Sequence, residues 1–294
     1  MSEAPLDPEE LEATAPAVQA ELAPQTTVGA VQLSVADLGR SLDYYRTAIG
    51  LDVLAEEDGR ASLGAGSREL LVLVEEPGAR PSDGYTGLYH FALLVPERRA
   101  LARWLAHAGR DRVALTGLSD HYVSEAIYLR DPDGHGIEIY ADRPREVWEG
   151  TVGSTLTTVP LNVQDLLGEL DDPQVEPFHG LPDGTVMGHV HLKAASIPET
   201  TAFYRDRVGF AVMAALGNQA VFLAAGGYHH HLGANSWESA GAAPAPPGTA
   251  RLLHFTIVVP DEAERDRVCE RVGLDEARGT DPSGNPFVLE VGRA

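Results

Sequence analysis

Histidine and carboxylate residues in two apolar segments have the pattern expected of metal ligands. His90 lies in GLYHFALL, and Glu138 follows 48 residues later in GIEIYAD, between two isoleucines. A carboxylate buried in such surroundings is costly unless a cation lies close to it. Two imidazoles and one carboxylate can hold a divalent ion on one face and leave its other positions open to a chelating ligand and dioxygen. These residues therefore indicate a mononuclear metal site that needs one more imidazole.

Other histidines could supply the missing ligand. They lie further along the chain, at His189, in the run His229–His231, and at His254. Side chains alternate between the two faces of a strand, so not all members of the run can serve one site. The fold decides which of these histidines meets His90 and Glu138.

The chain contains an internal repeat that must position these residues. Residues 28–51 align without a gap with residues 187–210, and residues 89–109 align with residues 253–273. Each half of the chain therefore contains two related units, which gives four units in the order 1, 2, 3, 4. Such self-similarity indicates tandem modules of one supersecondary type.

Each unit has the same order of predicted elements. A strand of alternating polarity is followed by a segment with helical spacing that ends at glycine, and then by short strands. The short strands are expected at 52–57, 60–65 and 68–76 in unit 1, and at 211–216, 219–225 and 228–234 in unit 3. A βαβββ unit cannot cover its own concave face, so units must pair. We predict an α+β fold of four tandem βαβββ modules, paired into curved mixed sheets that form cups.

The chain divides into four predicted parts. Residues 1–27 contain six acidic residues and no basic one, and we expect them to form an acidic disordered tail. Residues 28–141 are the N-terminal half with two modules, residues 142–186 are a connector with a short helix near VQDLLGEL, and residues 187–294 are the C-terminal half with two modules. Within the last part, the Pro-, Gly- and Ala-rich stretch 239–250 predicts a linker.

The repeat and its motifs resemble the vicinal-oxygen-chelate superfamily over residues 28–292. That group includes glyoxalases, bleomycin-resistance proteins and extradiol ring-cleaving dioxygenases. The segment HYVSEAIYLRDPDGHGIE (121–138) is similar to the extradiol signature, in which histidine, an apolar-Tyr pair, an Asp-Pro-x-Gly turn and glutamate follow in order. Ser119 departs from the residue that the signature prefers two positions before its histidine. Together with GLYHFALL and GGYHHH, this segment resembles the catechol-2,3-dioxygenase-like branch.

The resemblance implies a metal site with an unusual third ligand. It marks His90 and Glu138 as ligands, and it expects a histidine in unit 1 where this chain has Ala30. A methyl group cannot bind a metal. The corresponding position of unit 3 is His189, which the family pattern also marks as a ligand position. In unit 4, Val288 lies where a glutamate would be needed.

The pairing of the units decides which ligands meet. If neighbouring units pair, one cup holds only His90 and Glu138, and the other gathers His189, His254 and one histidine of the run. If unit 2 pairs with unit 3, a single cup gathers His90, Glu138 and His189. We favour the second pairing because it completes a triad from residues that would otherwise form two partial sites. His231 and His254 are the remaining candidate ligands.

The resemblance also implies residues that act on the substrate. His121 and Tyr128 match signature positions beside the metal, and the histidine run lies on a predicted strand where extradiol enzymes keep a catalytic histidine. The register narrows this base to His230 or His231, which would point to opposite faces. Its imidazole would move the substrate proton, and Tyr128 would stabilise developing oxyanion charge.

These features predict one function and leave two alternatives. We expect an Fe(II)-dependent extradiol dioxygenase that inserts O2 next to the diol of a catechol or a polycyclic hydroxylated aromatic, and Mn(II) suits the same ligands. A glyoxalase-like lyase or isomerase would keep the metal but need no dioxygen. A catalytically reduced aromatic-binding or self-resistance protein would explain Ala30 and Val288 as lost chemistry.

Composition limits the partners and the location. The formal net charge is -22, which argues against nucleic acid or an anionic membrane as a partner. No apolar run approaches the roughly 18 residues that a membrane span needs. The single cysteine, Cys269, cannot form an internal disulfide, and the acidic N-terminal segment lacks the features of a signal peptide. We expect a cytoplasmic protein, and the sequence leaves open whether it forms a homodimer.

Overall fold

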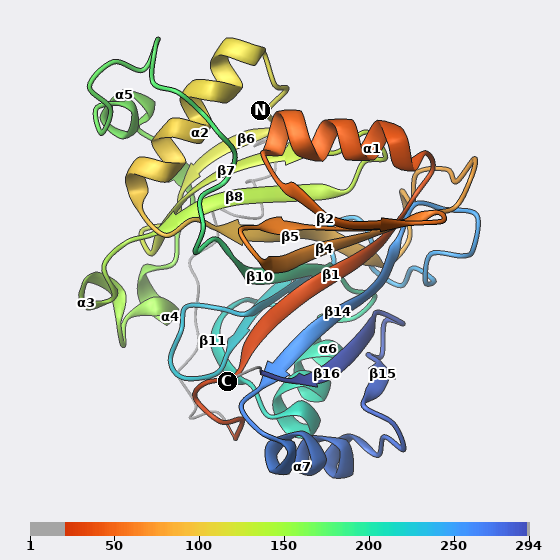
Figure 1. The fold of residues 1–294 in the computed structure, drawn as a ribbon. Coiled ribbons are helices and arrows are strands. Elements are labelled where there is room, and N and C mark those ends of the chain that lie inside the picture. The colour runs from red at the N-terminus through yellow and green to blue at the C-terminus, as the bar shows by residue number, and fades with distance from the viewer. Residues whose placement is uncertain (1–20, 293–294) are drawn as a thin grey trace, which may run out of the picture.

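Two mixed β-sheets form the core of the computed structural model, which describes residues 21–292 (Figure 1). The first sheet has seven strands in the order β15 (Arg278–Thr280), β16 (Pro286–Val291), β14 (Leu252–Val259), β1 (Thr27–Val35), β4 (Arg68–Glu75), β3 (Arg60–Ala65) and β2 (Asp52–Glu57). The second has nine, in the order β11 (Ala211–Leu216), β12 (Ala220–Ala224), β13 (Leu232–Asn235), β10 (Val186–Lys193), β5 (Gly87–Leu94), β8 (Gly136–Asp142), β7 (Ser124–Arg130), β6 (Gly117–Asp120) and β9 (Val159–Pro160).

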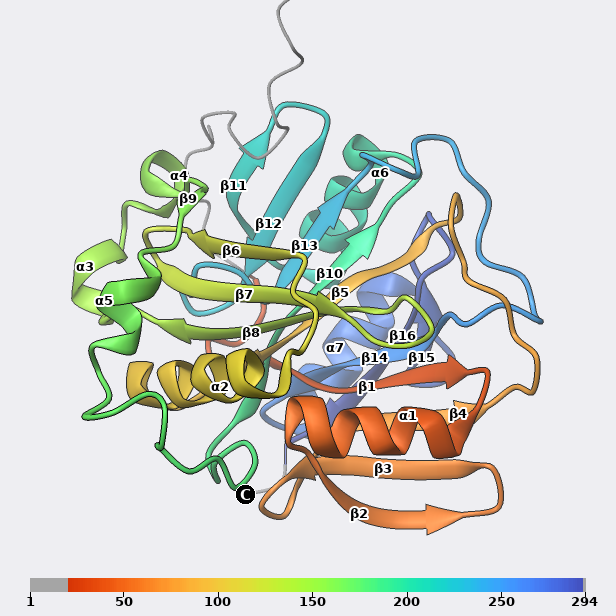
Figure 2. The same ribbon diagram turned by 90° about the horizontal axis from the view of Figure 1, so that it is seen from above.

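The order of the strands shows which units pair. In the first sheet β1 of unit 1 is antiparallel to β14 of unit 4, and in the second β10 of unit 3 is antiparallel to β5 of unit 2. Figure 2 shows β10 and β5 side by side at this junction. The favoured pairing of unit 2 with unit 3 is therefore the one observed, and the α+β class with paired modules is confirmed.

Helices cover the outer faces of both sheets. The first sheet is contacted by α1 (Leu38–Tyr44) and α7 (Glu262–Val272), and the second by α2 (Arg98–Asp111) and α6 (Ile197–Ala202). Two of these helices continue as π-helices: α1 as η2 (Tyr45–Ile49) and α6 as η3 (Phe203–Val208). Asp37, Ser196 and Asp261 cap α1, α6 and α7 by accepting a hydrogen bond from a backbone N–H in the first turn. Within residues 21–292, no helix is both long and apolar enough to cross a membrane.

A tyrosine and an Asp-Pro-x-Gly turn join the two modules in each half of the chain. The hydroxyl of Tyr45 donates to Asp131 at 2.9 Å, and that of Tyr204 donates to Asp281 at 3.3 Å. The other oxygen of Asp131 accepts the backbone N–H of His135 at 2.8 Å, which closes the turn before β8. This turn serves the structure, because it sets the start of the strand that carries Glu138.

The connector contains more structure than its sequence predicts. The expected helix near VQDLLGEL is α5 (Val163–Leu167), and the single-turn helices α3 (Arg145–Trp148) and α4 (Val152–Thr155) and the strand β9 also lie in this part of the chain. One turn is too short to produce a recognisable hydrophobic period. α4 packs against β11, and this contact holds the connector over the edge of the second sheet.

Candidate metal centre

One row of residues across four neighbouring strands contains two of the candidate ligands. His189 on β10 pairs with Ala92 on β5, Ala92 pairs with Glu138 on β8, and Glu138 pairs with Tyr128 on β7. His90 lies two residues before Ala92 and therefore faces the same side of the sheet. Because the fully buried Ala92 has only a methyl group, space remains between the side chains of His189 and Glu138.

The ligand atoms of the three residues form a nearly equilateral triangle. The Nε2 atoms of His90 and His189 lie 3.3 Å apart, and each lies 3.1 Å from Oε2 of Glu138. Ligand atoms about 2.1 Å from an ion and at right angles to each other are about 3.0 Å apart. The observed edges are close to that value, so the triangle fits one face of a six-coordinate divalent ion. Within residues 21–292, this is the only group of three such side chains with suitably close ligand atoms.

Burial and charge make this triangle suitable for a cation. Burial by itself raises the pKa of Glu138, but the charges and hydrogen bonds of His189 and His90 outweigh it and hold that pKa well below its usual range. Burial lowers the pKa of His189, although Glu138 opposes this shift, and burial thus favours the neutral imidazole that binds a metal. A divalent ion at the triangle would balance the charge of the buried carboxylate and would bind both imidazoles in their neutral form.

The three candidate ligands line a pocket, and His121 and Tyr128 form a hydrogen-bonded pair at the wall of this pocket. Nε2 of His121 lies 2.7 Å from the hydroxyl of Tyr128, and Nδ1 lies 2.9 Å from the backbone carbonyl of Thr157. A carbonyl can only accept a hydrogen bond, so Nδ1 carries a proton. In the neutral imidazole, Tyr128 is therefore the donor to Nε2.

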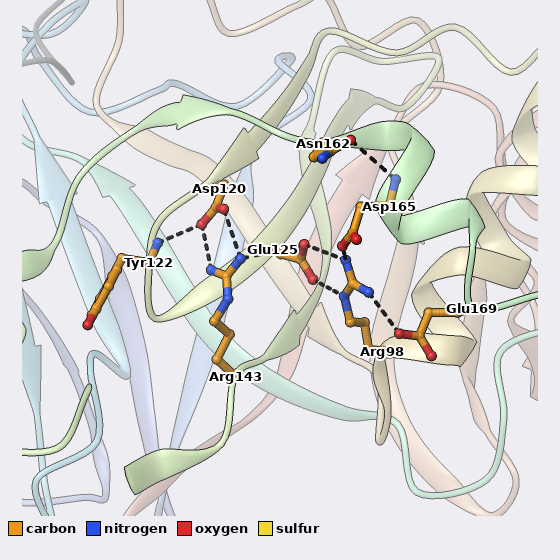
Figure 3. A network of polar contacts seen from close by, with 8 residues as sticks. All are labelled: Arg98, Asp120, Tyr122, Glu125, Arg143, Asn162, Asp165 and Glu169. Carbon is orange, nitrogen blue, oxygen red and sulfur yellow. Dashed lines mark hydrogen bonds and ion pairs between the residues drawn. The ribbon is translucent and has the colours of Figure 1, made fainter. Parts of the chain in front are cut away.

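An arginine network holds the β6–β7 turn that carries His121 (Figure 3). Arg143 contacts both oxygens of Asp120 at 2.5 and 2.8 Å. Arg98 on α2 contacts both oxygens of Glu125 at 2.5 and 3.0 Å and also reaches two acidic side chains in and after α5. Such paired contacts restrict the arginine geometry, so α2, β7 and the connector are fixed together next to the pocket.

The histidine run lies in irregular backbone between a glycine turn and β13, whereas its sequence predicts a strand. β13 begins only at Leu232, after the run. Gly226 and Gly227 have φ values of 60° and 69°, a backbone conformation that glycine adopts without strain, and they reverse the chain after β12. His231 already makes backbone hydrogen bonds to Leu223 and Val190 on the neighbouring strands, but the alternation of faces expected for a strand does not extend back to His229 and His230.

The members of the run point to different surroundings. His230 lines the pocket, and its ring centroid lies 4.1 Å from that of His189. Nδ1 of His231 instead accepts a hydrogen bond from the backbone N–H of Ala225 at 3.2 Å. His229 is fully buried and contacts Asp142. The structure thus brings His230, and not His231, beside the candidate ligands.

His254 lies in the other sheet. It lines a separate pocket between units 1 and 4, together with Ala30 and the charged residues Arg60, Arg278 and Glu290. This pocket corresponds in position to the candidate metal centre. It contains Ala30 where the other has His189, so the alternative ligand His254 is not brought together with His90 and Glu138.

Several residues that line the pocket are not among those predicted from the sequence. His191 pairs across the strands with His90, and Nε2 of His191 accepts a hydrogen bond from Asn235 at 3.0 Å. The spacing of His189 and His191 by two residues in HVHLKA predicts that they share a face, and this signal was available. The apolar wall is formed by Leu156, Leu216, Phe222 and Trp237, which lie on segments that no motif connects.

Acid should destabilise the metal-free protein through His231. Burial lowers the pKa of His231 to about 3 in the folded protein, whereas a histidine in an unfolded chain has a pKa of about 6.5. Between these values the unfolded state binds more protons. The free energy of unfolding therefore falls as the pH falls, by up to about 1.4 kcal/mol per pH unit for this group.

Urea unfolding of the metal-free protein between about pH 7 and pH 5 measures this effect. The His231→Gln variant has no imidazole at this position. The slope of its free energy of unfolding against pH should therefore be smaller, by an amount that corresponds to the uptake of up to one proton on unfolding. The same pH dependence in both proteins would contradict the assignment. Removing the metal beforehand keeps metal release out of the comparison.

Comparisons with known proteins agree with this architecture. Residues 27–139 match the profile of the Glyoxalase/Bleomycin resistance protein/Dioxygenase superfamily. A catechol-2,3-dioxygenase from Bacillus subtilis (strain 168) is 43% identical over 255 residues, which cover 84% of this chain and 87% of that protein. Among solved structures, a putative dioxygenase from Bacillus subtilis subsp. subtilis str. 168 has a TM-score of 0.60 at 14% identity and covers 92% of this chain and 87% of its own. Glyoxalase I from Zea mays has a TM-score of 0.55 at 16% identity, with 90% and 92% covered. At these identities the two structures show a shared fold.

Proposed function

Because this chain belongs to the glyoxalase/bleomycin resistance/dioxygenase superfamily, we propose that it is an Fe(II)-dependent extradiol dioxygenase that opens an aromatic ring next to a diol. The observation that supports this most is the buried triangle of two imidazoles and one carboxylate. It occurs in a chain that is 43% identical to a catechol-2,3-dioxygenase over most of both lengths.

In this proposal His90, Glu138 and His189 hold the metal. Fe(II) held by these residues would have open positions for the two oxygens of a chelating diol and for dioxygen. The same ligands suit Mn(II), so the activity with each metal has to be compared. The three side chains approach from one face of the second sheet, which leaves the pocket side for the substrate.

Side chains around the triangle would bind and orient the diol. Phe222 and Trp237 line the pocket and would pack against an aromatic ring. We assign to His230 the role of the base that takes a proton from a diol hydroxyl. Protonation of His121 would make both of its nitrogens donors, so Tyr128 would then direct its own hydroxyl proton to oxyanion charge that develops on the substrate.

The substrate class that fits these residues is a catechol or a fused-ring hydroxylated aromatic. Measuring oxygen uptake with catechol, after loading with Fe(II), with Mn(II) or with no metal, tests the proposal. Resorcinol, whose hydroxyls are not adjacent, is the matched control because it cannot chelate through both oxygens. We expect oxygen uptake only when both catechol and a bound metal are present.

The other outcomes identify the competing functions. Stoichiometric metal binding without oxygen uptake from any catechol would favour a glyoxalase-like lyase or isomerase. Binding of an aromatic ligand without metal would favour a sequestering protein. Either result would contradict the dioxygenase assignment.

A further inference from the structure

Two hydrogen bonds connect Asp142 to His230 through His229. Oδ1 of Asp142 lies 2.8 Å from Nε2 of His229, and Nδ1 of His229 lies 2.9 Å from Nδ1 of His230. The side chain of His229 is fully buried, whereas His230 lines the pocket beside His189. We propose that Asp142 and His229 are positioning residues that fix the tautomer of His230, with a proton on Nδ1 and none on Nε2.

The direction of each hydrogen bond follows from the groups at its ends. A carboxylate can only accept, so Nε2 of His229 carries the proton that Asp142 binds. A neutral imidazole has one protonated nitrogen, which leaves Nδ1 of His229 as an acceptor. The contact with His230 then requires a proton on Nδ1 of His230.

This tautomer matters for the role assigned to His230. Its Nδ1 is directed at His229, so Nε2 is the nitrogen that remains for the pocket. A base takes up a proton through a lone pair, and a protonated Nε2 has none to offer. In the opposite tautomer of both rings, the lone pair of His229 would also face the carboxylate of Asp142, which is repulsive.

Neighbouring aromatic residues hold Asp142 and His229 in these positions. The hydroxyl of Tyr228 donates to Oδ2 of Asp142 at 2.9 Å, and the hydroxyl of Tyr140 lies 2.9 Å from that of Tyr228. Oδ1 of Asp142 is therefore left for His229. The rings of Tyr228 and Trp148 pack against the imidazole of His229, with centroids 4.0 and 5.4 Å away, and restrict its rotation.

Nuclear magnetic resonance of the isotope-labelled full chain tests the tautomer directly. Long-range proton–nitrogen correlations distinguish protonated from unprotonated ring nitrogens, and the His230→Gln variant assigns the signals. Spectra of the metal-free protein and of the protein loaded with diamagnetic Zn(II) should both show Nδ1 of His230 protonated and Nε2 unprotonated. A protonated Nε2, or an imidazolium at His229, would overturn the proposal.

The Asp142→Asn variant provides a second test, which concerns the role of Asp142. Tyr228 donates a hydrogen bond to the position that Oδ2 of Asp142 occupies. In the variant, the amide oxygen should therefore face Tyr228 and the amide NH2 group should face His229. Each hydrogen bond in the chain then reverses, and Nε2 of His230 becomes protonated. An unchanged tautomer in a variant with wild-type thermal unfolding would overturn the role of Asp142.

Oxygen uptake with catechol measures the consequence, and this step rests on the proposed function. Asp142→Asn should lower kcat by about 10- to 100-fold without changing KM or metal content, and Asp142→Glu, which keeps an acceptor, should restore most of the activity. Loss of metal from Asp142→Asn would indicate a merely structural role and contradict the proposal. If the wild-type protein consumes no oxygen, the proposed function fails, whereas the tautomer can still be read from the spectra.

Discussion

Replacing Glu138 by glutamine should remove metal binding and ring cleavage together. The amide is neutral, so the ion would lose its only anionic ligand in a buried site where charge is expensive. A residue that merely hydrogen-bonds to a metal ligand is worth about 10- to 100-fold in affinity. We therefore expect loss of this ligand to weaken metal affinity by more than about 100-fold.

Metal content by mass spectrometry and oxygen uptake with catechol measure this result. Glu290→Gln is the matched control, because it makes the same chemical change on β16, which belongs to the other sheet. The control should keep both metal and activity. A Glu138→Gln protein that retains one ion per chain with wild-type affinity would show that the ion lies elsewhere.

Replacing His230 by glutamine should leave the metal in place and slow the reaction. General base catalysis contributes about 10²- to 10⁴-fold, and we expect kcat to fall within that range. Glutamine has a similar length and can still donate and accept hydrogen bonds, but it cannot take up a proton at neutral pH. KM should change little, because the ligands and the aromatic wall are untouched.

His231→Gln is the comparison that decides between the two candidate bases. The residue is next in the chain and similarly buried, but its Nδ1 contacts the backbone of Ala225 instead of the pocket. It should keep kcat within a few-fold of the wild-type value. A larger loss from His231→Gln than from His230→Gln would reverse the assignment.

Most of the fold could be predicted because each unit repeats the same pattern. Turn and glycine signals define the short strands of unit 1, and β2 and β3 have the predicted bounds. The α3 and α4 turns could not be predicted, because four residues carry too little periodic signal. Tertiary contacts with the sheet edge, which no local pattern encodes, stabilise them.

The candidate ligands could be predicted, whereas their surroundings could not. His90 and Glu138 lie in long motifs, and the pairing of units 2 and 3 follows from the need to complete a triad with His189. The small size of Ala92 becomes meaningful only once the strand register places it between His189 and Glu138. Register across strands from different units depends on long-range packing, which a single sequence does not display.

The histidine run shows how a local rule fails next to a site. Its residues were predicted to lie in a strand over 228–234, yet irregular backbone follows the turn at Gly226 and Gly227, and β13 begins only at Leu232. The backbone of His231 already hydrogen-bonds to Leu223 and Val190 on the neighbouring strands, whereas the side chain of His229 is oriented by its hydrogen bond to Asp142. A run that joins the backbone ladder only at its last residue can direct neighbouring imidazoles to different partners.

An anomalous-difference map from crystals of the protein loaded with Fe(II), collected at the iron absorption edge, tests the central claim most directly. We predict one peak per chain, bonded to Nε2 of His90, Nε2 of His189 and a carboxylate oxygen of Glu138. A peak at His254 in the pocket between units 1 and 4, or no peak at the triangle in an iron-loaded crystal, would contradict the account.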